Sequence, residues 1–320
     1  MRERGLPGTG LRLTELGFGA ASLGNLYVET PDEVAAATVD AAWEAGIRYF
    51  DTAPHYGLGL SERRLGAALR GRPRDEYVLS TKVGRLLVPR VPPADRDDDI
   101  FEVPGDLTRR WDFTRDGVRR SIDESLARLG VDRIDIAYVH DPDASGVPGA
   151  AASAAEALIE LREEGVLRAV GIGTNSVDAA LHLLSETDID TAMIAGRVTL
   201  LDHGRVEELL AAAGTRRLVA AAVFNGGLLA VPRPASGAHF DYRPAPDELL
   251  ARANRIADVA QAHGATLPQA ALAYPLTFPG VATRVVGMRT PEEVSANVAL
   301  ATAEPPAALW DALRAASLLD

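Results

Sequence analysis

Residues 47–62 read I-R-Y-F-D-T-A-P-H-Y-G-L-G-L-S-E, and the interpretation of the whole chain starts from this stretch. An apolar run that includes Phe50 ends in an acid, Asp51, and Tyr56 follows five residues later in a loop rich in glycine and proline. A strand that ends at a charged residue and opens into such a loop is a common way for a protein to present chemical groups. The pattern therefore predicts a strand end at a functional site.

Two later apolar runs end in the same way, one at Lys82 and the next at His140. A lysine ammonium beside a tyrosine favours the ionised phenol and lowers its pKa. Asp51 would hold Lys82 in place and compensate its charge, while His140 would hydrogen-bond a substrate oxygen beside Tyr56. We expect these four residues to form a general acid–base site for carbonyl reduction or alcohol oxidation.

Short apolar runs alternate with amphipathic helical patterns along the chain. Strand-like runs cover residues 16–20, 48–51, 77–82, 134–140, 167–173, 189–195, 218–224 and 281–287. Helical patterns cover residues 31–45, 61–69, 114–129, 151–164, 177–185, 203–213 and 247–263. Such alternation predicts parallel strands with crossover helices, and eight strands favour a closed (β/α)8 TIM barrel formed by one domain, residues 1–320. The Rossmann glycine pattern does not follow the first strand, which weakens that alternative.

Composition narrows the class of protein. The 320 residues are 47% hydrophobic, and a net charge of -12 argues against a nucleic-acid partner. The absence of cysteine removes disulfides, thiol catalysis and thiolate metal sites. No apolar run has the length of a membrane span, and the N-terminus lacks the apolar region of a signal peptide, so a cytoplasmic location is expected. The oligomeric state is left open.

Two long segments, 84–112 and 224–246, interrupt the rhythm after the third and seventh strands. Both lie at the C-terminal mouth of the expected barrel, so they are interpreted as walls of a substrate pocket. Trp111 and Phe113 belong to this wall or simply pack beside it, and His55 is assigned to the pocket. The acidic run 95–99 is interpreted as a disordered surface excursion. His55 and His140 lack a third matching ligand, so no metal site is expected.

The motifs F-D-T-A-P-H-Y-G, S-E-R-R-L-G, S-T-K-V-G and S-L-A-R-L-G-V-D-R-I-D-I-A-Y-V-H-D resemble those of the aldo-keto reductases. The resemblance extends over nearly the whole chain, from Leu16 to Asn297. It implies a (β/α)8 barrel with a nicotinamide cofactor extended across its C-terminal face. It also implies that Tyr56 is the proton donor, that Lys82 and Asp51 assist it, and that His140 orients the substrate.

The resemblance implies cofactor contacts as well. It places Gly19 and Ala20 near the cofactor and Asp51 near the nicotinamide ribose. It gives the carboxamide contact to Asn175, although the usual Ser-Asn reads T-N here. A loop that covers the pyrophosphate would comprise Phe224, Asn225, Gly226 and Leu228. The adenosine half would bind at the start of the final helix, through Gly287, Arg289, Glu293 and Asn297. For Phe224, stacking on the cofactor and packing in the core stay equally open.

The choice between NAD and NADP depends on this last segment. Many members of the family carry a cation where Gly287 stands and an arginine where Glu293 stands, and both bind the 2′-phosphate of NADP. A carboxylate at Glu293 would repel that phosphate and could accept a bond from a free 2′-hydroxyl. Arg289 favours the opposite choice. We expect NAD, with NADP as the alternative.

Stretches such as L-G-F-G-A-A-S-L-G-N-L-Y look most like the branch with aldose 1-dehydrogenases, L-fucose dehydrogenase among them, and pyridoxal 4-dehydrogenase. The implied reaction is oxidation of the cyclic hemiacetal of an aldose, or of pyridoxal, to a lactone. One alternative is an NADPH-dependent aldehyde or ketone reductase. Two others are a nicotinamide-binding regulatory subunit with negligible turnover and a metal-dependent barrel enzyme.

Overall fold

Eight parallel strands close into a barrel in the computed structural model, which describes residues 1–241 and 243–319. Each strand pairs with the next in the order β3, β4, β5, β8, β9, β10, β11, β14, and β14 pairs back to β3. Their bounds are Leu16–Gly19, Tyr49–Asp51, Val78–Val83, Ile136–His140, Ala169–Thr174, Thr191–Ala195, Leu218–Ala221 and Val281–Gly287. The predicted (β/α)8 barrel is confirmed.

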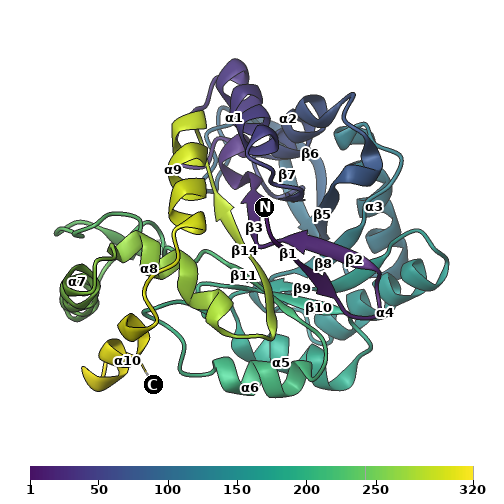
Figure 1. Cartoon of the computed structure of the whole chain (residues 1–320). Coiled ribbons are helices and arrows are strands. Elements are labelled where there is room, and N and C mark those ends of the chain that lie inside the picture. Colours follow the sequence, from purple (N-terminus) through teal and green to yellow (C-terminus); the bar gives the residue numbers. More distant parts are fainter. Residues whose placement is uncertain (242, 320) are drawn as a thin grey trace.

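Helices surround the barrel, as the ring of coiled ribbons in Figure 1 shows. They are α1 (Asp32–Glu44), α2 (Leu60–Leu69), α3 (Arg115–Leu129), α4 (Ala150–Glu163), α5 (Val177–Glu186), α6 (Val206–Ala213), α7 (Asp247–Ala262), α8 (Leu267–Ala273), α9 (Pro291–Thr302) and α10 (Ala308–Ala315). Local sequence fixes several starts, because Thr114, Ser176 and Thr290 each accept a backbone N–H of the first turn. Within the described residues, no helix is long and apolar enough to cross a membrane.

A hairpin of β1 (Glu3–Leu6) and β2 (Leu11–Thr14) covers the N-terminal end of the barrel. Leu6, Leu11 and Leu13 are buried against side chains of the barrel interior such as Tyr49 and Tyr138. The barrel is therefore closed by apolar packing at this end. In barrels of this kind the functional residues lie at the opposite mouth.

Several predicted boundaries need correction. The seventh strand ends at Ala221 and not at 224, because the chain turns there with a positive φ of 51° at Ala222. The sixth helix begins at Val206, three residues after the predicted start. The helix that starts at Pro291 is not the last, since α10 follows it.

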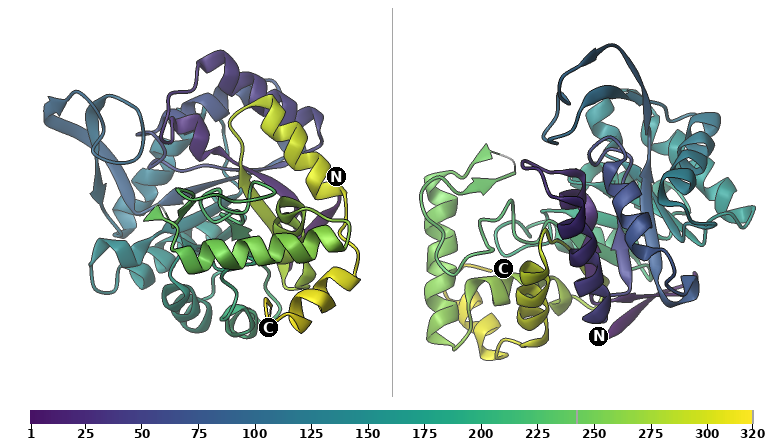
Figure 2. Two further views of the ribbon diagram at one scale, coloured as in Figure 1. Left: turned by 90° about the vertical axis from the view of Figure 1, so that its left-hand side faces the viewer. Right: turned by 90° about the horizontal axis from the view of Figure 1, so that it is seen from above.

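The long segment after β5 is an antiparallel hairpin of β6 (Arg85–Ala94) and β7 (Gly105–Trp111) that projects beyond the barrel mouth in both views of Figure 2. The segment after β11 contains a short pair, β12 (His239–Phe240) and β13 (Arg243–Pro244). Both segments had been expected to be loops.

The prediction that residues 95–99 are disordered is wrong. The carboxylate of Asp97 accepts two hydrogen bonds from Arg109, both 2.7 Å long, and its side chain is 1% exposed. A second contact fixes the position, because Arg109 also donates to the carbonyl oxygen of His55 at 2.9 Å. A buried charge is stable only when it is paired in this way. The ion pair joins the tip of the hairpin to β7, and the bond from Arg109 to His55 joins β7 to the loop after β4.

Candidate active site

The four polar strand-end residues converge at the C-terminal mouth of the barrel. Lys82 Nζ donates to Asp51 Oδ2 at 2.6 Å, to the Tyr56 hydroxyl at 3.0 Å and to the carbonyl oxygen of Thr52 at 3.0 Å. The rings of Tyr56 and His140 lie 5.8 Å apart at an interplanar angle of 88°. The predicted cluster is thus assembled, with the ammonium bonded to the phenol and the imidazole ring next to the tyrosine ring.

Lys82 is the only lysine in the chain, beside 32 arginines. It is 3% exposed, so its charge is held almost completely out of water. An arginine would place a larger, planar cation where three acceptors surround a compact ammonium, and its charge could not be adjusted by the surroundings. The chain thus uses arginine at its 32 other Lys/Arg positions and lysine only at this buried one.

Burial and neighbouring charges set the protonation states. Burial alone would lower the pKa of Lys82, but the attraction of Asp51 outweighs it and the pKa is raised. Burial raises the pKa of Tyr56; Lys82 opposes this shift, and Asp51 adds to it. Lys82 lowers the pKa of Tyr56, as expected, but burial raises it by more, so the net shift in the protein alone is upward. Tyr56 is a protonated phenol at neutral pH in this state.

The two histidines at the barrel mouth, His55 and His140, are uncharged at neutral pH. Burial, together with the cations Arg85 and Arg109, lowers the pKa of His55 to about 2. The same causes, with Lys82, hold the pKa of His140 well below its ordinary value. A neutral imidazole carries one N–H donor and one acceptor, which suits it to orient a hydroxyl or carbonyl oxygen.

A second layer of buried polar groups supports Asp51. Its other carboxylate oxygen, Oδ1, accepts a 2.7 Å hydrogen bond from Ser80, whose hydroxyl also lies 3.1 Å from the hydroxyl of Tyr49. Tyr49 in turn contacts the hydroxyl of Tyr138 at 3.1 Å. Both Asp51 oxygens are therefore satisfied, which keeps the carboxylate in one orientation toward Lys82.

Glycines allow the loop that carries Tyr56 to pack against the chain after β3. Gly57 has a φ of 62°, and any side chain there would collide with the carbonyl oxygen of Gly24. Gly24 is similarly closed in by the backbone of Tyr56. This close approach explains why the sequence H-Y-G follows the strand, and it fixes the tyrosine over the barrel mouth.

A cavity of about 280 Å³ opens directly above the cluster. Eight residues predicted for the site line it: Gly19, Asp51, His55, Tyr56, Lys82, His140, Asn175 and Gly287. The edge beside Gly287 is open, because a Cβ added there would meet only Ser22 Oγ at 3.9 Å and the Gly19 carbonyl oxygen at 4.0 Å.

Other predicted residues lie outside the cavity lining. Ala20 is fully buried, and its neighbour Ala21 lines the cavity instead. Trp111 stacks on Phe113 with ring centroids 5.5 Å apart, and Arg85 lies over Trp111, so this pair packs beside the mouth and does not line the pocket. Phe224 is half-buried between two core clusters, which favours packing.

The remaining cofactor candidates surround the mouth on two further segments. Asn225 donates to the carbonyl oxygen of Gly196 at 3.1 Å, while its buried Oδ1 has no partner. Gly226 is exposed, whereas Leu228 is fully buried, backbone included, and presents no surface to a ligand. The Oδ1 atom of Asn225 is therefore a buried acceptor whose hydrogen bond is unmet among the described residues.

The start of α9 holds the last three candidates. The exposed Glu293 accepts the backbone N–H of Arg289 at 2.7 Å, and Asn297 lies half-buried one turn later. The guanidinium of Arg289 points away from Glu293 and binds carbonyl oxygens of residues 26 and 28. These contacts of Arg289 could not be read from the sequence.

The site also contains residues that were not predicted. Asp141 follows His140, carries Oδ2 3.5 Å from His140 Nε2 and binds Arg85 at 2.8 Å. Its place directly after a strand end was a usable signal. Phe101, whose ring centroid lies 5.3 Å from that of His55, gave no such signal, because it belongs to the hairpin tip.

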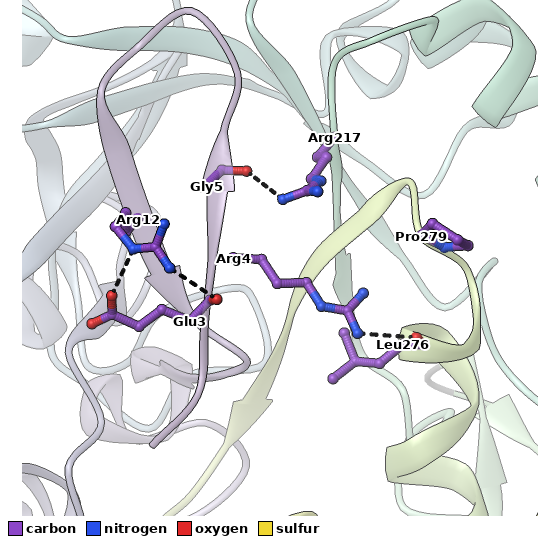
Figure 3. A pocket seen from close by; sticks show the side chains of 7 residues that line it. All are labelled: Glu3, Arg4, Gly5, Arg12, Arg217, Leu276 and Pro279. Carbon is purple, nitrogen blue, oxygen red and sulfur yellow. Dashed lines mark hydrogen bonds and ion pairs between the residues drawn. The ribbon is translucent and has the colours of Figure 1, made fainter.

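A second hollow at the other end of the barrel has a different character. Figure 3 shows three arginines around it, and each already has a partner: Arg12 binds Glu3, Arg4 binds the carbonyl oxygen of Leu276, and Arg217 that of Gly5. The contacts of Arg4 and Arg217 join the N-terminal hairpin to the rest of the chain, whereas the Arg12–Glu3 pair lies within the hairpin. The four predicted catalytic residues line the cavity at the opposite mouth. Among the described residues, no group of three or more His, Asp and Glu could hold a metal.

Comparison with known proteins decides the family. The sequence model described as "Aldo/keto reductase family" matches residues 15–317. The chain belongs to the aldo/keto reductase family. It is therefore an oxidoreductase of a class that uses nicotinamide cofactors.

Characterised relatives lie in the expected branch. The chain is 48% identical over 97% of its length to D-threo-aldose 1-dehydrogenase of a Pseudomonas species, covering 96% of that protein. It is 38% identical over 99% of its length to pyridoxal 4-dehydrogenase of Microbacterium luteolum, covering 98% of that protein. The holo structure of an aldo-keto reductase from Bacillus halodurans superposes with a TM-score of 0.76 at 28% identity, covering 100% of this chain and 97% of the other.

Proposed function

We propose that this aldo/keto reductase oxidises the cyclic hemiacetal of an aldose, or of pyridoxal, to a lactone with NAD as oxidant. The observation that carries the proposal is the buried contact of the only lysine, Lys82, with the Tyr56 hydroxyl at 3.0 Å and with Asp51 at 2.6 Å. The similarity to D-threo-aldose 1-dehydrogenase over nearly the full length of both chains supports the substrate class.

The proposed roles follow from the geometry. Tyr56, as phenolate, accepts the proton of the anomeric hydroxyl while the C–H electron pair leaves as hydride and the C–O bond becomes a carbonyl. Lys82 stabilises the phenolate, and Asp51 keeps Lys82 charged and in place. Neutral His140 hydrogen-bonds the reacting oxygen. Bound NAD supplies the hydride acceptor and a positive charge that favours the phenolate.

The preference for NAD is supported by the start of α9. Gly287 offers no cation, and the carboxylate of Glu293 occupies the first turn, where a 2′-phosphate would be repelled. The one nearby cation, Arg289, is already engaged with the carbonyl oxygens of Leu26 and Val28. Among the other contacts, Asn225 and Gly226 are proposed to cover the pyrophosphate, and Asn175 to bind the carboxamide.

The substrate end of the cavity combines one aromatic face with polar groups. The ring of Phe101 offers an apolar face for the C–H side of a sugar or for a pyridine ring. His55, Asp141 and Asn175 supply polar atoms around it. A small polyhydroxylated ring suits this mixture better than a long apolar aldehyde.

The test is a spectrophotometric screen for reduced cofactor with NAD and NADP against a panel of aldoses and pyridoxal. We expect turnover of one of these substrates, with a higher kcat/KM for NAD than for NADP. A tenfold preference for NADP would overturn the cofactor assignment. Binding of cofactor without turnover of any carbonyl or hemiacetal would instead favour the regulatory alternative.

A second candidate function is carbonyl reduction with the reduced cofactor. It is favoured by the raised pKa of Tyr56, because a protonated phenol is the form that donates a proton to a developing alkoxide. Running the same screen in both directions separates the candidates. A kcat/KM for reduction above that for oxidation at neutral pH would support the reductase. The cytoplasmic location stays a prediction.

A further inference from the structure

The guanidinium of Arg289 is engaged with backbone carbonyls and a hydroxyl. It donates to the carbonyl oxygen of Leu26 at 2.7 Å, to that of Val28 at 3.1 Å and to the hydroxyl of Thr30 at 3.0 Å. Among the described residues, no carboxylate lies within ion-pair distance of it. Arg289 therefore binds residues 25–30, which we call the mouth segment, and all of its acceptors there are uncharged.

The mouth segment in turn holds the tip of the β6–β7 hairpin. The backbone N–H of Tyr27 donates to the carbonyl oxygen of Ile100 at 2.8 Å, and that of Glu102 donates to the carbonyl oxygen of Asn25 at 2.9 Å. Leu26 and Phe101 form an isolated antiparallel bridge. Leu26, Ile100 and Phe101 all line the catalytic cavity. Arg289 thus supports one wall of the substrate pocket although it lies outside the cavity.

On its other side, Arg289 belongs to the proposed adenosine site. Its backbone N–H donates to Glu293 at 2.7 Å, at the start of α9, where the 2′ position of the adenosine ribose is proposed to lie. Arg289 thus contacts the proposed adenosine site through its backbone and the substrate wall through its side chain. Figures 1 and 2 show the corresponding arrangement, with α9 beside α1 and the chain that precedes α1.

We propose that Arg289 couples the identity of the cofactor to substrate affinity. With NAD bound, the guanidinium keeps its hydrogen bonds to the mouth segment, and the mouth segment and the hairpin tip keep their positions in the pocket wall. With NADP, the 2′-phosphate competes for the guanidinium, because a charge-assisted bond to a phosphate is stronger than a bond to a neutral carbonyl. The mouth segment and the hairpin tip then lose their tie, and the substrate binds more weakly. This inference rests on the proposed placement of the adenosine half.

A second arginine, Arg64, also binds the mouth segment, so loss of the Arg289 contacts affects the segment only in part. Arg64 donates to Asn25 Oδ1, to the carbonyl oxygen of Thr30 and to that of Leu23, each at 2.7 Å. Removal of Arg289 therefore loosens the wall without detaching the segment. Arg64 binds the same segment but belongs to α2, so it provides a matched control variant.

The experiment compares wild type, Arg289→Met and Arg64→Met by hydrogen exchange of peptides that contain residues 25–30 and 97–103. In wild type, we expect exchange to be slower with NAD than with adenosine 2′,5′-bisphosphate, the fragment that carries the competing phosphate. In Arg289→Met, exchange should be fast and the same with both. Arg64→Met should exchange faster overall and keep the difference. Equal exchange in wild type and Arg289→Met would overturn the proposal.

Kinetics give the second readout. In wild type, the substrate KM should be higher with NADP than with NAD. Arg289→Met should raise the KM with NAD about tenfold, the effect of losing one or two such bonds, with a smaller effect on kcat, and should abolish the dependence on the cofactor. A retained dependence would overturn the coupling.

Two outcomes separate this inference from the proposed function. If no aldose is oxidised but the ligand-dependent exchange is observed, the coupling is supported and the substrate assignment fails. If NAD leaves the first turn of α9 unprotected, the placement of the adenosine half fails and the coupling fails with it.

Discussion

Replacement of Lys82 by methionine removes the only ammonium that contacts the Tyr56 hydroxyl. At an effective dielectric constant of about 20, unit charges 3.0 Å apart interact by about 5 kcal/mol. Without its partner, the buried Asp51 takes up a proton, and its opposing effect on Tyr56 is lost as well. The loss of the Asp51 charge offsets about half of the lost attraction between Lys82 and the phenolate. The net loss is therefore about 2.5 kcal/mol, which raises the pKa of Tyr56 by about two units.

The expected result is a displaced pH profile. If Tyr56 is the base for hemiacetal oxidation, kcat/KM rises tenfold per pH unit until Tyr56 is ionised. In Lys82→Met that rise should continue about two units further, and kcat/KM at neutral pH should fall about 100-fold. The assay is kcat/KM for the best aldose against pH, with thermal unfolding to check that the variant is folded.

Arg85→Met is the matched control, because it removes another cation from the same mouth that does not contact the Tyr56 hydroxyl. Arg85 binds Asp141 and lies over Trp111. Its loss should move the profile by much less than the loss of Lys82. An unmoved profile in Lys82→Met, or activity within threefold of wild type, would refute the proposed electrostatic role.

Four further predictions concern single residues. Tyr56→Phe should lower kcat by at least about 1,000-fold while cofactor binding, followed by fluorescence, changes little; substantial turnover would remove the assigned mechanism. Glu293→Arg should raise kcat/KM for NADP relative to NAD at least about tenfold, and an unchanged ratio would mean that Glu293 does not face the ribose. Arg109→Leu leaves Asp97 buried without a partner and should cost about 3 kcal/mol in urea unfolding, whereas a loss below 1 kcal/mol would contradict burial of the pair. Because the pKa of His55 is about 2 in the folded protein and near 6.5 when unfolded, stability should fall below about pH 6.5 by about 1.4 kcal/mol per unit, and His55→Phe should show a shallower loss.

The barrel was predictable because its signals are local. Each parallel strand is buried on both faces and reads as a short apolar run, and each crossover helix shows its own period. The three polar strand ends at Asp51, Lys82 and His140 were visible for the same reason. Parallel strands bring their C-terminal ends together, so residues far apart in the sequence meet at one mouth.

The β6–β7 hairpin was not predictable in this way. Prolines at positions 89, 92 and 93 suggested a loop, since proline cannot donate to a ladder. A two-stranded ribbon tolerates them because half of its N–H groups face away from the partner strand. The burial of Asp97 depends on Arg109, twelve residues away, and the engagement of Arg289 depends on residues more than 250 positions away. No local pattern encodes such contacts.

The burial of Lys82 makes the chain unusual as a protease substrate. A protease specific for lysine has one possible cleavage site in 320 residues, and that site lies inside β5, at 3% exposure. Cleavage requires β5 to leave the barrel, so the rate at which one cut appears reports how often the barrel opens. Any ligand that binds only the closed barrel should slow that cut in proportion to its occupancy, which allows binding to be measured without turnover.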